Sequence, residues 1–150
     1  MAGHGKERTV LTAMIFVPAA SALFILLLVK EERHVRLAAL AATLTVLVLG
    51  LIVWSGIDLD ERDPQWVQKH SWISAFKVQY FVGVDGLSAP LLALTGLLGV
   101  GAVLVSWGVN HRVKEFFFWL LLLETGIIGV FVSLDLLLFF LFWEVELIPM

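Results

Sequence analysis

Two glutamates lie deep inside long apolar segments in the second half of the sequence. Glu144 stands within F-F-L-F-W-E-V-E-L-I-P-M, and Glu124 stands within the apolar run from Phe116 to Ser133. An ionised carboxylate at the centre of a membrane helix costs about 2.5–3.5 kcal/mol on insertion scales, and such groups usually mark ion or proton pathways. We therefore take Glu144 and Glu124 as candidate proton-carrying residues.

The positions of these acids predict a particular relation between them. Each lies about nine residues inside its segment, which at 1.5 Å per residue is close to the middle of a membrane. In an antiparallel hairpin the two carboxyls can approach each other, and burial beside a second carboxylate favours a shared proton. Glu146 is roughly 200° around the helix from Glu144, so it must face a different neighbour. Pro149 cannot donate to the carbonyl of Val145 and should kink the helix there.

A structural role for the same acids is an open alternative. A buried glutamate can hold a bundle together through a hydrogen bond to a neighbouring helix, without any part in transport. This alternative is stronger for Glu146 than for Glu144 or Glu124. Asp135, which interrupts two apolar runs, is predicted to be a turn residue.

Composition predicts an integral membrane protein. Hydrophobic residues make up 60% of the 150 residues, charged residues make up 15%, and the mean hydropathy is +0.96. The sequence contains no cysteine, which excludes disulfides and thiolate ligands to iron–sulfur clusters within it. It has no P-loop and no G-x-G-x-x-G after a strand, so we expect no bound nucleotide, and it lacks the basic residues of a nucleic-acid binder.

The apolar runs predict an all-α transmembrane fold with five helices in a single membrane domain. The first run is too long for a signal peptide and is followed by charges, not by a cleavage site. Runs four and five are nearly continuous and would overshoot the bilayer as one helix, so a turn is expected near Ser133 to Asp135. The predicted spans are 9–29, 37–57, 87–109, 116–133 and 135–150, with the last one truncated and a loop at 58–85.

Charged residues in the connections predict the topology. Basic residues concentrate between spans one and two and between spans three and four, so both connections should face the cytoplasm. The acidic loop 58–85 should lie on the opposite side. Within this loop, apolar residues at every second position from Phe76 to Val84 predict a short β segment. Asp85 is predicted to cap the third span, with Pro90 in its first turn.

Two segments resemble a known family. These are F-V-G-V-D-G-L-S-A-P-L-L-A-L-T-G-L-L, Phe81 to Leu98, and L-L-L-E-T-G-I-I-G-V-F-V-S-L-D-L-L-L-F-F-L-F-W-E-V-E-L-I-P-M, Leu121 to Met150. They closely resemble the M-type antiporter-like membrane subunit of bacterial NADH–quinone oxidoreductase, respiratory complex I, and its counterpart in the related complex of chloroplasts and cyanobacteria. The resemblance covers residues 72–150 well, and the preceding part only in its two-helix layout.

The resemblance implies a larger protein of about fourteen transmembrane helices, built around two inverted repeats with broken helices. The present sequence would supply its N-terminal part. The resemblance also implies that Glu144 pairs with a lysine on a later helix and takes part in proton translocation. No Lys or Arg follows Lys114 in this sequence, so that lysine would belong to a continuation of the chain.

The function implied is that of a proton-translocating membrane-arm subunit, a non-redox part of an NADH–quinone oxidoreductase. NADH and quinone would be used elsewhere in the complex, and no cofactor or metal would be bound by this chain. Its partners would be other membrane-arm subunits and the lipid of the bacterial inner (cytoplasmic) membrane. Two alternatives are a subunit of a multi-subunit cation/proton antiporter and a structural membrane protein without a transport role.

Overall fold

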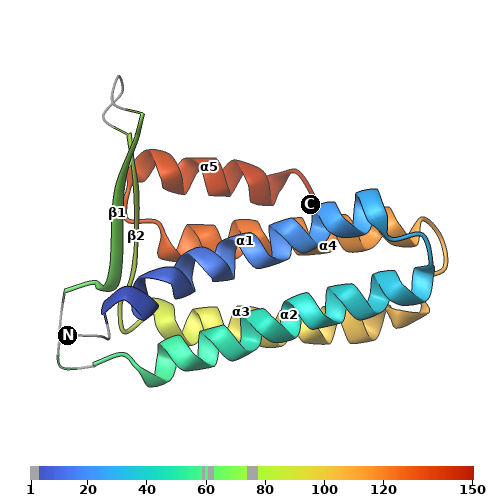
Figure 1. Ribbon diagram of the computed structural model, residues 1–150, viewed down its shortest axis with the longest axis horizontal. Helices are drawn as coiled ribbons and strands as arrows, with labels where there is room; N and C mark the ends of the chain where they lie inside the picture. Colours follow the sequence, from blue (N-terminus) through green and yellow to red (C-terminus); the bar gives the residue numbers. More distant parts are fainter. Residues whose placement is uncertain (1–3, 59, 61–62, 74–77) are drawn as a thin grey trace.

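The computed structural model describes residues 4–58, 60, 63–73 and 78–150. Within them, five α-helices run parallel or antiparallel to one another, and a two-stranded sheet stands across one end of them (Figure 1). The helices are α1 (His4–Leu28), α2 (Glu32–Ser55), α3 (Ser88–Val105), α4 (Val113–Val132) and α5 (Leu136–Leu147), and the strands are β1 (Gln65–Ile73) and β2 (Val78–Val84). A short 3₁₀ helix, η2 (Ser106–Gly108), extends α3. The predicted all-α membrane fold is confirmed.

Helices α1 to α4 form the bundle, and α5 lies along the outside of α4. Neighbouring helices in the bundle are α1 with α2 and α4, and α3 with α2 and α4. Within the described residues four segments are long and apolar enough to cross a membrane: 9–28, 32–55, 88–108 and 113–132. α5 has 12 residues, which extend about 18 Å and fall short of a hydrocarbon core of about 30 Å. The predicted fifth span is therefore a shorter helix here.

The predicted turn between α4 and α5 is confirmed. α4 ends at Val132 and α5 begins at Leu136, and the carboxylate of Asp135 accepts hydrogen bonds from the N–H groups of Leu137 and Leu138 at 2.9 and 3.1 Å. These N–H groups have no partner within the helix, so the side chain caps it. Asp135 is thus a turn and capping residue, as the sequence predicts.

The predicted β segment is one strand of an antiparallel hairpin. β2 pairs with β1 on one side, and the N–H of Leu134 donates to the carbonyl of Phe81 at 2.9 Å on the other. The hairpin is thereby joined to the α4–α5 turn. The sequence-based strand was expected to begin at Phe76, which lies outside the described residues. Asp85 directly follows the last residue of β2. Its carboxylate accepts hydrogen bonds from the N–H groups of Leu87 and Ser88 at 3.1 and 2.7 Å, so the predicted cap at the start of α3 is confirmed.

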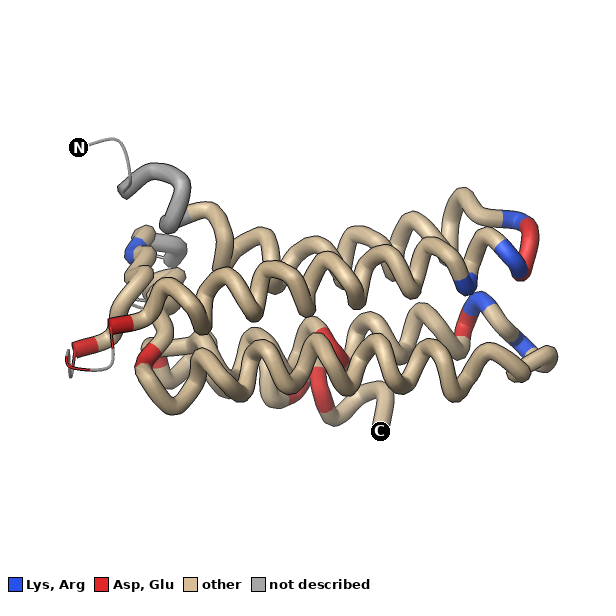
Figure 2. Tube along the Cα trace, turned by 90° about the horizontal axis from the view of Figure 1, so that it is seen from below, with Lys and Arg blue, Asp and Glu red and all other residues tan. Residues whose placement is uncertain are grey.

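Charge separates along the length of the bundle. Figure 2 shows the basic positions mostly at one end, where a few acidic positions accompany them, further acidic positions at the opposite end, and a small acidic group midway. The connections α1–α2 and α3–α4 lie together at the basic end (Figure 1). The two basic connections therefore lie on the same side, as the sequence predicts.

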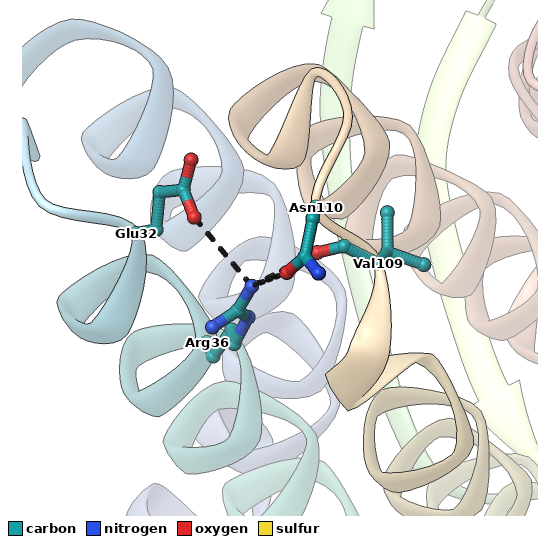
Figure 3. A network of polar contacts seen from close by, with 4 residues as sticks. All are labelled: Glu32, Arg36, Val109 and Asn110. Carbon is teal, nitrogen blue, oxygen red and sulfur yellow. Dashed lines mark hydrogen bonds and ion pairs between the residues drawn. The ribbon is translucent and has the colours of Figure 1, made fainter.

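Arg36 joins the two connections at the basic end. Its Nη2 donates to the carbonyl of Val109 at 2.9 Å and to Oδ1 of Asn110 at 3.0 Å, and it lies 3.6 Å from the carboxylate of Glu32 (Figure 3). From sequence Arg36 is interpreted as a topology signal and a contact for lipid headgroups. The structure adds that it anchors the α3–α4 connection to α2.

Candidate carboxylate site at mid-bundle

The buried core consists of two apolar clusters, one toward each end of the bundle. The cluster next to the hairpin contains Leu11, Met14, Ile15, Val46, Val53, Val82, Val84, Ala89, Leu92, Ile128, Val132 and Leu138. The cluster next to the basic end contains Ala22, Ile25, Val29, Val35, Ala39, Ala42, Val103, Val113, Phe117 and Leu121. On each of the four bundle helices, a short stretch of residues separates the members of one cluster from the members of the other.

Polar or atypical residues occupy this stretch in every bundle helix. We call Pro18, Thr43, Thr95, Gly99 and Glu124 the mid-bundle layer; it comprises one residue each from α1, α2 and α4 and two from α3. Pro18 has no N–H to donate to the carbonyl one turn before it. The apolar core of the bundle is thus interrupted midway along its length by these five residues, of which one, Glu124, is ionisable.

Glu124 is the ionisable member of this layer. Only 5% of its surface is exposed. Neither carboxylate oxygen has a hydrogen-bond partner among the residues that the structure describes. Leaving a buried polar group without a partner is costly, and it costs far more for a charged group than for a neutral one. The site therefore suits a carboxyl that is protonated for part of the time, or one that receives a partner.

The neighbouring hydroxyls do not supply that partner. Those of Thr43, Thr95 and Thr125 donate to carbonyls of their own helices, at 3.1, 2.8 and 2.9 Å. Such bonds are local and weak, and a hydroxyl can rotate to another acceptor. Thr43 and Thr95 therefore place two rotatable donors in the same layer as Glu124.

A cavity of about 270 Å³ adjoins Glu124 between α3 and α4. It is walled by Leu91, Leu94, Thr95, Leu98, Gly99, Ala102, Leu120, Leu123, Glu124, Ile127 and Phe131. Glu124 and Thr95 are the polar side chains in a wall that is otherwise apolar or glycine. The cavity is open on one side, where Leu94 and Leu98 are exposed. Its volume is enough for several water molecules at about 30 Å³ each, and these would need polar partners such as the carboxyl.

Glu144 occupies a different environment from the one expected. Its side chain is exposed, among apolar side chains that are also exposed on the outer side of α5, including Phe140 and Trp143. The reason is that α5 packs mainly against α4 and β2, and the side of α5 that carries Glu144 is not covered by any described residue. The described residues therefore do not bury Glu144, in contrast to the expectation from sequence. An acid on an apolar face at this depth requires a polar neighbour on that face.

The structure does not bring Glu124 and Glu144 into a hydrogen-bonded pair. The carboxylate of Glu124 points to Gly99 on α3, and neither of its oxygens is bonded to a described residue. α4 and α5 do form the expected tight hairpin: a Cβ on Gly126 would lie 2.9 Å from the Cα of Glu146. In that register Glu124 and Glu144 differ in depth by about one helical turn, or about 5 Å.

Two residues of the site are not indicated by sequence. Gly99 and Thr43 form the surroundings of the Glu124 carboxylate. From sequence, helix packing is a sufficient explanation for Gly99, and no motif points to Thr43. The basic groups of the bundle are far from the site: the ion pairs Glu31–His34, Glu32–Arg36 and Arg112–Glu115 all lie in or beside the two basic connections.

Fold and site together define the class: a helical membrane protein of several spans, with acids midway along the length of its bundle. The chain is homologous to chain 4 of NAD(P)H-quinone oxidoreductase from cyanobacteria. It is 40% identical over 141 residues to chain 4-2 of Synechocystis sp., 43% to a chain 4 of Picosynechococcus sp., and 42% to a chain 4 of Microcystis aeruginosa. No family model matches the chain.

The alignments confirm the resemblance and extend it. They cover 93% of this chain, so they include much of the first two helices, where the motifs alone indicated only a common layout. The chain spans about a quarter of the length of these relatives, 25% to 26%.

Proposed function

We propose that this chain is part of a proton-translocating membrane-arm subunit of an NAD(P)H-quinone oxidoreductase. The observation that carries the proposal is the mid-bundle layer, in which Glu124 is buried without a partner among the described residues, in a chain homologous to a subunit of that enzyme. In this proposal the chain performs no redox step and binds neither nicotinamide nor quinone. Placement in the bacterial inner (cytoplasmic) membrane, against other membrane-arm subunits, belongs to the same proposal.

Glu144 and Glu124 have distinct roles in this proposal. Glu144 is exposed on the outer side of α5, so it is the acid that meets a cationic side chain from a segment or subunit covering that face. Glu124 is enclosed in the bundle beside the cavity, so it exchanges a proton with water or with a rotating hydroxyl. A change in charge elsewhere in the membrane arm would alter the pairing of Glu144 and thus its proton affinity.

The energetic requirement sets what these groups must do. Moving one elementary charge against 100 mV costs about 2.3 kcal/mol. A pairing that is broken and remade at low dielectric can change the free energy of an acid by that amount, since one pKa unit is about 1.4 kcal/mol. Electrostatic coupling between buried acids and their partners is therefore sufficient in magnitude.

The test is proton uptake driven by NAD(P)H in inverted membrane vesicles that contain the full-length subunit. Glu144→Gln is isosteric and removes only the titratable charge, so assembly should be unchanged while coupled uptake falls about tenfold or more. Glu115→Gln is the matched control, because Glu115 is exposed at the basic end of α4 and pairs with Arg112 at 2.8 Å. Uptake should be unchanged in this variant.

Other outcomes identify the alternatives. If Glu144→Gln is as active as the wild type at equal complex content, the acid is structural and its proposed role is withdrawn. If transport proceeds without NAD(P)H or quinone and depends on an opposing sodium gradient, the chain belongs to a cation/proton antiporter instead.

A further inference from the structure

The side chain of Glu124 occupies the space that a side chain on Gly99 would need. A Cβ placed on Gly99 would overlap Oε1 of Glu124, and would lie 3.0 Å from its carboxyl carbon and 3.4 Å from Cγ2 of Thr43. Gly99 is on α3, Thr43 on α2 and Glu124 on α4. The carboxylate is therefore held where three helices meet, and it reaches that position because residue 99 has no side chain.

Other glycines of the bundle have a different function. A Cβ on Gly96 would lie 2.5 Å from the Cα and 2.7 Å from the N of Leu47, and one on Gly50 would lie 3.0 Å from the Cα of Ala93. These two glycines allow the backbones of α2 and α3 to approach each other. At Gly99 the obstructing atoms belong to the end of a flexible side chain, so the carboxylate would move and the helices would not.

We propose that Gly99 is a positioning residue for the Glu124 carboxylate. This inference rests on the proposed function, in which Glu124 exchanges a proton. A proton passes between groups only when their heavy atoms lie within about 2.6–3.2 Å of each other or are bridged by one water. A methyl group at residue 99 forces the carboxylate to another rotamer, away from the junction of α2, α3 and α4.

The consequence for proton exchange follows from the size of this displacement. Misplacement of a reacting group by about 1 Å can cost on the order of a hundredfold in rate. The cavity beside Glu124 leaves room for the displaced carboxylate, so the fold should tolerate the change. Gly99→Ala is therefore expected to assemble normally and to lower coupled proton uptake about tenfold.

The experiment compares four variants of the full-length subunit in membrane vesicles at equal complex content. Gly99→Ala is the test, and Gly101→Ala is its matched control, since a Cβ on Gly101 meets no atom within 4 Å and gives the same gain in helix propensity. Glu124→Gln measures the role of the carboxyl itself. The double variant Gly99→Ala with Glu124→Asp shortens the acid by one methylene, which makes room for the added methyl group.

The proposal expects loss of uptake in Gly99→Ala and Glu124→Gln, no loss in Gly101→Ala, and at least partial recovery in the double variant. A purely structural defect in helix packing would not be relieved by a shorter acid. If Gly99→Ala fails to assemble, recovery of assembly in the double variant supports the same clash, and no recovery overturns it.

Three results contradict the proposal, and they separate it from the proposed function. Full uptake in Gly99→Ala beside a loss in Glu124→Gln removes the role of Gly99 and leaves that of Glu124. Loss in Gly99→Ala without recovery in the double variant assigns the effect to helix packing. Full uptake in Glu124→Gln removes both residues from the pathway, while the result for Glu144→Gln stands independently.

Discussion

The backbone of Glu146 on α5 lies directly against Gly126 of α4. A Cβ on Gly126 would lie 2.9 Å from both the Cα and the N of Glu146, and 3.0 Å from its Cβ. This contact determines which side of α5 faces the bundle. Glu144 is two residues away, roughly 200° around the helix, and this explains why its side chain is exposed.

We predict that Gly126→Ala separates α4 from α5. Overpacking of this kind costs about 1–3 kcal/mol, and here the obstructing atoms are backbone, so a side-chain rotation cannot relieve it. The midpoint temperature of thermal unfolding of the purified subunit in detergent should therefore be lower than that of the wild type. Gly101→Ala is the control and should leave the transition unchanged or raise it slightly. An unchanged transition in Gly126→Ala would show that the hairpin does not depend on this contact.

A second prediction concerns Arg36 at the basic end. Arg36→Ala removes charge-assisted hydrogen bonds to Val109 and Asn110, each of a kind worth about 1.5–3 kcal/mol. Proteolysis of the α3–α4 connection should therefore become faster. Arg36→Lys keeps the charge but loses the planar fork, so an intermediate rate is expected. Arg33, which is exposed and lies three residues before Arg36 in α2, is the control. Equal rates for Arg33→Ala and Arg36→Ala would refute the prediction.

The third prediction is a pH dependence at the hairpin end. Hydrogen bonds from the backbone N–H groups of Ser88 and Leu87 hold the pKa of Asp85 below its ordinary value of 3.8. Because the folded-state pKa is lowered, the stabilisation is present above 3.8 and is lost as the pH falls through the lower folded value.

Asp85→Asn should abolish this contribution to the acid dependence. An asparagine still caps a helix, so stability at neutral pH should be close to that of the wild type. The effect is small because Asp85 is exposed. The midpoint temperature of thermal unfolding should be measured from neutral pH to below pH 3.8. As the pH is lowered, this midpoint should fall less steeply in Asp85→Asn than in the control Asp63→Asn. Equal slopes in the two variants would mean that the cap does not contribute.

Local features of this protein follow directly from its amino-acid sequence. The cap at Asp85, the turn at Asp135 and the strand that ends at Val84 depend on a few adjacent residues, and each is found where those residues predict it. The placement of both basic connections at one end follows from the number of apolar runs between them. These features need no information about which helix packs against which.

The directions of the two glutamates depend on tertiary structure. Apolar residues occur on all sides of α4 and α5, so no amphipathic stripe in the sequence indicates which side of either helix faces inward. The rotation of each helix is set by close contacts such as Gly126 with Glu146 and Gly96 with Leu47. For that reason Glu124 faces α3 and not α5, and Glu144 lies outside. Residue counting places both acids near the middle of their segments, but the register of the α4–α5 hairpin separates them by about one helical turn.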